Sequence, residues 1–186
     1  ALTGIEVTTM PKTDYFVGDE FDPTGMIVTA TYDDGSTRSV TGYTISDIDM
    51  STAGTKTVTV TYTENSVTET TTFEIAVQEI VQTGVEIVPD KDIYTVGDVF
   101  DAGVSVYALY NNGDRIILTE GYEITFTQDG QPVVDGQTLE TSGTIIATVT
   151  CNGFTATHEI TVREPGQVVI DVTVLGGGVF GTLYLT

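Results

Sequence analysis

Apolar and polar residues alternate one by one over much of this chain. Segment 26–32 places four apolar residues on one face and mainly threonine on the other: Met26, Val28, Ala30 and Tyr32. Segments 58–62, 73–77 and 104–110 repeat this period of two, which is the period of a β-strand. No segment has the apolar spacing of an amphipathic helix. About seven short strands in every 80 residues or so, with frequent turns, predict an all-β chain of small β-sandwiches.

The same run of segments occurs twice in the chain. The segment 15–22 (YFVGDEFD) returns as 94–101 (YTVGDVFD), and the turn 33–36 (DDGS) returns as 111–114 (NNGD). Further matches keep the same order, so the repeat predicts two copies of one domain. We place them at 1–80 and 81–164. The remainder, 165–186, is a C-terminal β segment that fits either a hairpin or a partial third module.

The second copy is longer than the first between its central turn and its last hairpin. The extra residues lie near 126–138 and include the turn pairs Asp129-Gly130 and Asp135-Gly136. Insertions of this kind are usually found in surface loops, so we expect an exposed loop here.

The charge of the chain is strongly negative. It has 27 acidic residues against 6 Lys and Arg, a formal net charge of −21. Such a chain is repelled by phosphate backbones, which argues against nucleic acid as a partner. No stretch has the length and polarity of a transmembrane helix, so we expect no membrane insertion. A single cysteine forms neither an internal disulfide nor a thiolate zinc site.

The repeated pattern resembles a known family. Gly-Ile-Glu-Val at 4–7, Tyr-x-Val-Gly-Asp-x-Phe-Asp at 15–22 and the run AGTKTVTVTY at 53–62 are similar to the bacterial immunoglobulin-like domains of group 3. The two copies cover most of the chain. The resemblance implies tandem β-sandwiches in secreted or cell-surface proteins, often of Gram-positive bacteria, where such domains act as spacers, stalks or adhesive segments. It implies no catalytic residues and no cofactor.

Clustered carboxylates are the first candidate site. They lie in the repeated turn of each copy: Asp19, Glu20, Asp22, Asp98 and Asp101. Ca²⁺ binds six to eight oxygens, and acidic clusters supply them, so these residues are calcium candidates. The other interpretation is a turn that reverses the chain before a core phenylalanine. We favour the turn, because the acidic residues do not have the spacing of a known calcium-binding loop.

Nucleophilic and metal chemistry finds little support in the sequence. Cys151 shares a face with apolar residues and has no basic neighbour in sequence, which predicts a buried thiol. His158 is the only histidine, so it lacks a partner for a metal or a nucleophile, and we expect it to pack at the rim of the core. No catalytic motif is present, so we predict a non-enzymatic chain.

Exposed aromatic residues are the second candidate site. Tyr107 replaces Thr29 on an outward face, and Phe126 has no counterpart in the first copy. Aromatic rings of this kind serve as stacking platforms for sugars, so these two residues are candidates for carbohydrate binding.

Three functions remain open from the sequence. The preferred hypothesis is a non-catalytic extracellular spacer or display module of a bacterial surface protein, whose partners are the other domains of that protein. The first alternative is an adhesion or carbohydrate-binding module with a host glycan or protein as partner. The second is a set of accessory domains in a larger secreted hydrolase.

Overall fold

The computed structural model describes residues 1–166 of this chain, in two compact units. The first unit spans Ala1–Val81, and the second begins at Gln82. Every regular element of residues 1–166 is a β-strand, which confirms the predicted all-β class. In that range no helix has the length and apolarity to cross a membrane. The predicted segment 165–186 lies outside the described residues from 167 onward.

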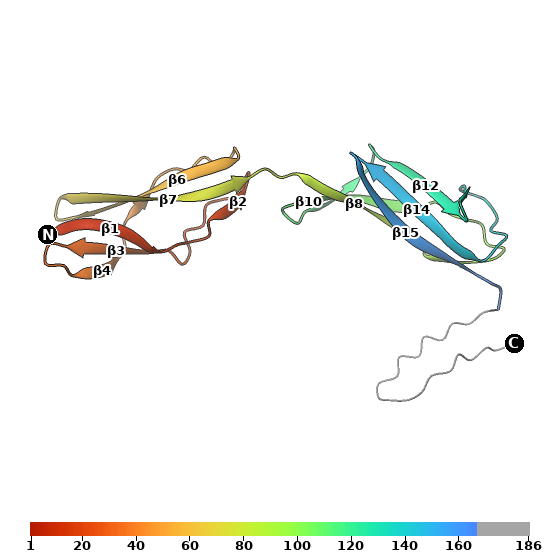
Figure 1. Ribbon diagram of the computed structural model, residues 1–186, viewed down its shortest axis with the longest axis horizontal. Helices are drawn as coiled ribbons and strands as arrows, with labels where there is room; N and C mark the ends of the chain where they lie inside the picture. Colours follow the sequence, from red (N-terminus) through yellow and green to blue (C-terminus); the bar gives the residue numbers. More distant parts are fainter. Residues whose placement is uncertain (167–186) are drawn as a thin grey trace, which may run out of the picture. The chain divides into compact units, whose positions relative to one another are not determined.

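The first unit is a sandwich of two sheets (Figure 1). One sheet has the order β1-β3-β4, formed by Leu2–Thr9, Ile27–Tyr32 and Thr37–Val40. The other has the order β2-β7-β6-β5, formed by Asp14–Phe16, Val67–Gln78, Gly54–Glu64 and Thr44–Ile45.

The second unit repeats this plan with one more strand in its second sheet (Figure 1). Its small sheet has the order β11-β10-β8, formed by Arg115–Leu118, Val104–Tyr110 and Gln82–Pro89. Its large sheet has the order β13-β12-β14-β15-β9, formed by Gln131–Pro132, Glu123–Gln128, Gly143–Cys151, Phe154–Arg163 and Ile93–Thr95.

The alternating residues form the two cores, as the pattern predicted. In the first unit Val28, Ala30 and Val58 are at most 1% exposed, and they face one another from opposite sheets. In the second unit Val106 and Ala108 occupy the equivalent buried positions. Because the outward residues between them are mostly threonine, the β-branched side chains suit both the buried and the solvated surface of each strand.

The first two strands of each unit lie in different sheets. After β1 the chain crosses over, and β2 pairs in parallel with β7, with Tyr15 opposite Val77. In the second unit β9 pairs in parallel with β15 in the same way, with Tyr94 opposite Val162. The sequence predicted strands in these segments but not this parallel pairing, because the partner strand lies some sixty residues away in the chain.

The insertion in the second unit is exposed over most of 129–138, and apolar side chains in it and directly after it pack inward. It lengthens β12 and adds β13, and the chain then folds inward, so that Val133 is 6% exposed and Leu139 only 1%. The N–H of Gly97 donates to the carbonyl of Leu139 (2.8 Å), and the N–H of Phe100 donates to the carbonyl of Gln137 (2.8 Å). Residues 129–138 are exposed apart from Val133, and Leu139 directly after them is buried, so this segment forms surface and also closes one side of the core.

Candidate functional site

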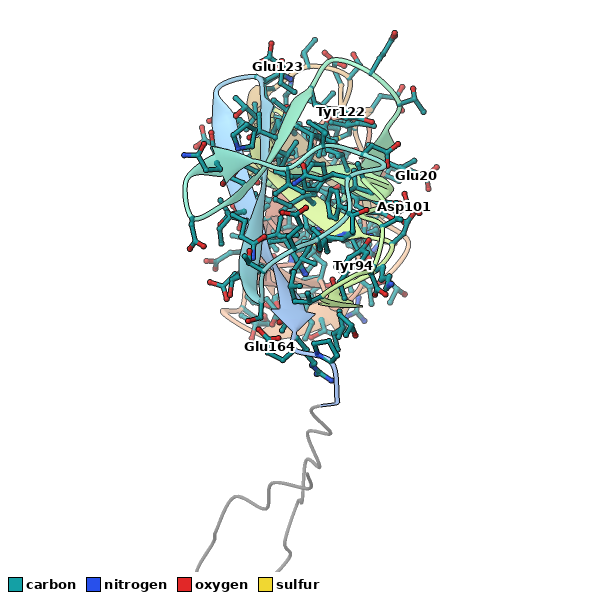
Figure 2. All side chains as sticks on the ribbon, turned by 90° about the vertical axis from the view of Figure 1, so that its right-hand side faces the viewer. Glu20, Tyr94, Asp101, Tyr122, Glu123 and Glu164 are labelled. Atoms are coloured by element: carbon teal, nitrogen blue, oxygen red, sulfur yellow. The ribbon has the colours of Figure 1, made fainter. Side chains whose placement is uncertain are left out.

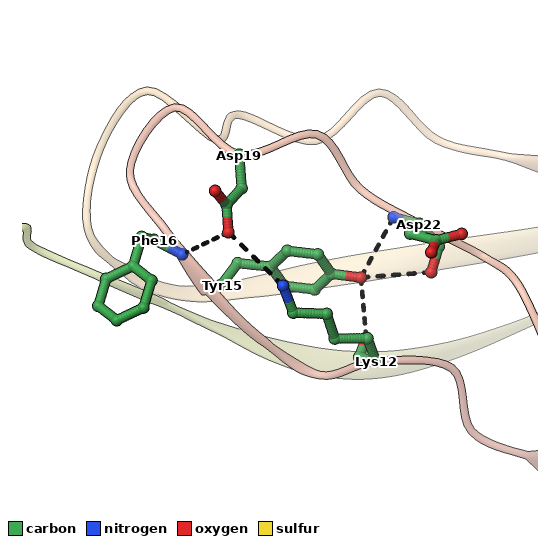
Figure 3. Close-up of polar contacts among 5 residues, drawn as sticks. All are labelled: Lys12, Tyr15, Phe16, Asp19 and Asp22. Atoms are coloured by element: carbon green, nitrogen blue, oxygen red, sulfur yellow. Dashed lines mark hydrogen bonds and ion pairs between the residues drawn. The ribbon is translucent and has the colours of Figure 1, made fainter. Parts of the chain in front are cut away.

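The repeated acidic turn is organised by a buried tyrosine (Figure 3). Tyr15 is 1% exposed, and its hydroxyl donates to the carbonyl of Lys12 (3.0 Å) and accepts the N–H of Asp22 (3.2 Å). The centre of the Tyr15 ring lies 5.9 Å from the centre of the Phe21 ring. Lys12 Nζ lies over the Tyr15 ring, 4.5 Å from its centre. The tyrosine thus joins both ends of the turn to the core.

The carboxylates of this turn bind the turn itself. Asp19 accepts the N–H of Phe16 (2.9 Å) and lies 3.6 Å from Lys12 Nζ, as Figure 3 shows. Asp22 accepts the N–H of Thr24 (2.9 Å). Hydrogen bonds from Thr24 lower the pKa of Asp22, because they stabilise the ionised carboxylate. The side chain of Thr24 has the larger effect and its backbone N–H the smaller one. Glu20 is exposed to solvent.

The second unit repeats the same arrangement. Asp98 accepts the N–H of Thr95 (3.0 Å) and pairs with Lys91 Nζ (3.2 Å), and the Thr95 bond is the main reason for the lowered pKa of Asp98. Asp101 accepts the N–H of Gly103 (2.9 Å), and its own carbonyl accepts the hydroxyl of Tyr94 (3.0 Å). Figure 2 shows Tyr94 and Asp101 close together on this side of the unit.

The geometry of the two turns explains their acidity without a ligand. Each aspartate oxygen named above faces a backbone N–H or a lysine, and these contacts fix the chain reversal. In residues 1–166 no group of three or more His, Cys, Asp or Glu side chains is placed to hold a metal ion. The predicted weak calcium site at these positions stays a prediction.

Tyr107 lies on the outward face of the small sheet of the second unit, as the repeat predicted. It stands opposite Glu86 in β8 and Ile117 in β11. The guanidinium of Arg115 lies 3.3 Å from the centre of the Tyr107 ring, and Arg115 Nε donates to Glu86 Oε2 (2.6 Å). That hydrogen bond is the main reason for the lowered pKa of Glu86. Because the arginine covers one face of the ring, Tyr107 is a poor stacking platform for a sugar on that face.

The Phe126 ring packs against the core of the second unit. It meets Phe100 edge-on, with centroids 5.0 Å apart, and packs with the buried residues of that unit. The sequence identified Phe126 as unmatched, but the reason for the mismatch is internal packing.

A shallow depression of about 350 Å³ lies near one end of the second unit. It is lined by Gly121, Tyr122, Glu123, Thr150, Cys151 and Asn152, and Figure 2 shows Tyr122 and Glu123 side by side there. Cys151 is 4% exposed, as predicted, and takes the place of Tyr62 in the first copy.

His158 forms a contact that the sequence did not reveal. Its Nε2 lies 2.9 Å from Asp92 Oδ1, and the histidine is half-buried at the rim. It takes the place of Phe73, the buried phenylalanine of the first unit. No sequence signal could show this pair, because the two residues are far apart in the chain and meet only when β9 pairs with β15.

The comparisons with known proteins bear on the first unit most directly. Residues 8–77 match the family described as "Bacterial Ig-like domain (group 3)". Residues 8–77 belong to this family. The second Ig-like unit shares the strand plan and the repeated turn of that domain.

A longer stretch of this Ig-like pair resembles part of an enzyme. It is 34% identical over 170 residues to "Pectate lyase L" of Thermoclostridium stercorarium. The alignment covers 88% of this chain and 13% of the lyase, so the chain spans a small fraction of the length of that protein.

Two solved structures align with most of this chain at low sequence identity. Domains 1–6 of the surface layer protein SbsC align with 90% of this chain and 28% of that chain, with 16% identity and a TM-score of 0.37. A chimeric titin Z1Z2-Z1Z2 tandem aligns with 86% of this chain and 99% of that chain, with 14% identity and a TM-score of 0.27.

Proposed function

We propose that this chain is a non-catalytic extracellular module in which two Ig-like units space or display other domains of a larger protein. The observation that carries the proposal is the parallel pair of strands in each unit, β2 with β7 and β9 with β15. Its repetition suits a part whose task is to resist pulling through its ends.

The pairing determines how a unit responds to tension. The chain enters each unit ahead of the first strand of the pair and leaves after the second. Because the two strands are parallel, tension on the ends pulls them along their lengths in opposite directions. All the hydrogen bonds between them then resist together instead of opening one at a time.

The hydrogen bonds of this ladder are well formed. In the first unit the N–H of Val17 donates to the carbonyl of Gln78 (2.9 Å), and the N–H of Ala76 donates to that of Thr13 (2.8 Å). In the second unit the N–H of Val96 donates to the carbonyl of Arg163 (2.8 Å). Each bond contributes on the order of 1 kcal/mol to stability, but under shear the bonds of a ladder are loaded simultaneously.

Force spectroscopy of the full chain tests this role. We expect two unfolding events, and we expect Val17→Pro, which removes one donor of the ladder, to lower the force of only one of them. Val96→Pro is the matched variant and lowers the other. Unchanged forces in both variants would contradict a mechanical role for the parallel pairs.

The resemblance to a pectate lyase supports a more specific setting for the same role. We propose that the two units accompany a catalytic domain in a secreted, polysaccharide-degrading protein, without contributing to its chemistry. The 34% identity with a 13% portion of the lyase supports an accessory part of such a protein. Incubation of the chain with polygalacturonate tests the non-catalytic part of the proposal: we expect no unsaturated product, and product formation would overturn it.

A further inference from the structure

Strand β11 forms an open edge of the second unit. The sheet order β11-β10-β8 leaves it with one partner, and no strand of residues 1–166 pairs with its far side. The N–H of Tyr110 donates to the carbonyl of Asp114 (3.0 Å), so these two residues form a hydrogen-bonded pair of the hairpin. In antiparallel strands hydrogen-bonded and non-hydrogen-bonded pairs alternate. Arg115 and Ile117 therefore stand in non-hydrogen-bonded pairs, and their N–H and C=O groups point away from β10.

The corresponding edge of the first unit is more polar at the two positions that follow the first residue of the strand. There β4 has Arg38 and Ser39 at the positions of Ile116 and Ile117. Arg38 donates to the hydroxyl of Tyr32 (2.8 Å) and to Glu64 (2.7 Å). A charged side chain on an edge strand is a common defence against unwanted strand pairing.

On β11 both of these positions are apolar and solvent-accessible. Ile116 is 49% exposed and Ile117 is 57% exposed, and the two side chains point to opposite faces of the sheet. On the outward face the apolar surface continues into the sheet through Tyr107, Leu109 and Val88, the last of which is 37% exposed. An added strand would therefore meet apolar contacts on both of its faces.

The chemistry of this surface favours a polypeptide over a sugar. Sugars stack on uncovered aromatic rings, but Arg115 covers one face of the Tyr107 ring, and the neighbour of Tyr107 on β11 is the exposed aliphatic Ile117. A row of unpaired backbone groups flanked by aliphatic side chains is what an extended peptide recognises when it joins a sheet edge.

The charge around the edge excludes acidic occupants, including a second copy of this chain. Asp114 and Glu120 flank β11, and Arg115 is already paired with Glu86. An antiparallel pairing of two copies centred on Ile117 would place Asp114 of one copy opposite Glu120 of the other. Like charges in opposite positions are destabilising.

We propose that β11 binds an extended, uncharged or basic segment of another polypeptide, which pairs with Arg115–Leu118 as an added strand and contributes alternating apolar side chains. This interaction is separate from the proposed spacing role and does not depend on it.

Selection with random linear peptides of strand length, displayed on phage, provides the probe. We expect selection on the full chain to enrich peptides with alternating apolar residues and few acidic ones. Ile117→Pro removes only the outward N–H, and proline is tolerated at such positions of edge strands, so it should weaken binding of a selected synthetic peptide about tenfold or more. Ser39→Pro makes the equivalent change in the first unit and should leave binding unchanged.

Two further measurements keep the result interpretable. Hydrogen exchange of the Ile117 amide should slow when the peptide binds, because that N–H gains an acceptor. Ile117→Lys tests the same edge through a charge if the proline variant unfolds. Failure to enrich peptides, equal binding to both Ile117 variants and the wild type, recognition of a neutral glycan at this face, or dimerisation that Ile117→Lys abolishes would each overturn the proposal.

Discussion

Phe126 packs edge-on against Phe100 in the second unit, with ring centroids 5.0 Å apart. In the first unit the equivalent phenylalanine, Phe21, meets Phe73 instead, at 6.3 Å. The second unit has His158 where Phe73 lies, so the aromatic ring that covers the core comes from a different strand. The longer β12 is what makes this replacement possible, because it extends the strand as far as Gln128.

This exchange predicts the effects of substitution. Phe126→Ala should destabilise the second unit by about 2–4 kcal/mol, somewhat less than the range of about 3–5 kcal/mol for a phenylalanine in a core, because Phe126 is only partly buried. Chemical denaturation followed by a probe in each unit measures the change. Adding His158→Phe to this variant gives the second unit a phenylalanine at the position of Phe73, and this should recover part of the lost stability. Equal stability of Phe126→Ala and the wild type would show that the edge-on contact contributes nothing.

The tyrosine of the repeated turn predicts a matched pair of variants. Tyr15→Phe keeps the ring but leaves the N–H of Asp22 and the carbonyl of Lys12 without their partner. We expect a loss of about 1–3 kcal/mol in the first unit, since unsatisfied groups at a partly buried site are costly. Tyr94→Phe should have the same effect in the second unit. Urea denaturation of both variants tests whether the repeated motif has one structural role.

The lowered pKa of Asp98 predicts how the stability of the second unit changes with pH. The folded pKa lies below the ordinary value of 3.8, mainly because of the hydrogen bond from the N–H of Thr95. The ionised carboxylate therefore stabilises the fold fully above about pH 4, and this contribution is lost as the pH falls through the folded pKa.

A difference measurement isolates this effect from the general charge of the chain. Asp98→Asn should be less stable than the wild type by a constant amount above about pH 4, and the difference should shrink at lower pH. Melting temperatures of the two proteins across the acidic range provide the comparison. A difference that does not change with pH would count against the ionised carboxylate as the stabilising group.

The acidic turns also allow a direct test of calcium binding. Because Asp19, Asp22, Asp98 and Asp101 are engaged by N–H groups of their own turns, we expect Ca²⁺ to raise the melting temperature no more than Mg²⁺ does at equal ionic strength. Asp19→Asn with Asp98→Asn is the control for any general effect of charge. A rise specific to Ca²⁺ that this double variant abolishes would establish the site after all.

The sequence determined the all-β class, the repeat and the inward faces of the strands. These features are local: a period of two needs only neighbouring residues, and Val28 and Ala30 are buried because each is apolar at the same phase of one strand. The repeat made the turn around Tyr15 recognisable because its contacts lie within the nearest ten residues.

The tertiary structure alone decided what the unmatched residues do. The sequence could not tell that Phe126 faces Phe100, that the insertion buries Leu139, or that Arg115 covers Tyr107. Each of these contacts joins residues on different strands, and its existence depends on strand register and on which edge lies open. Those are properties of the paired sheets, which is why the exposed edge at Ile117 became visible only in the folded chain.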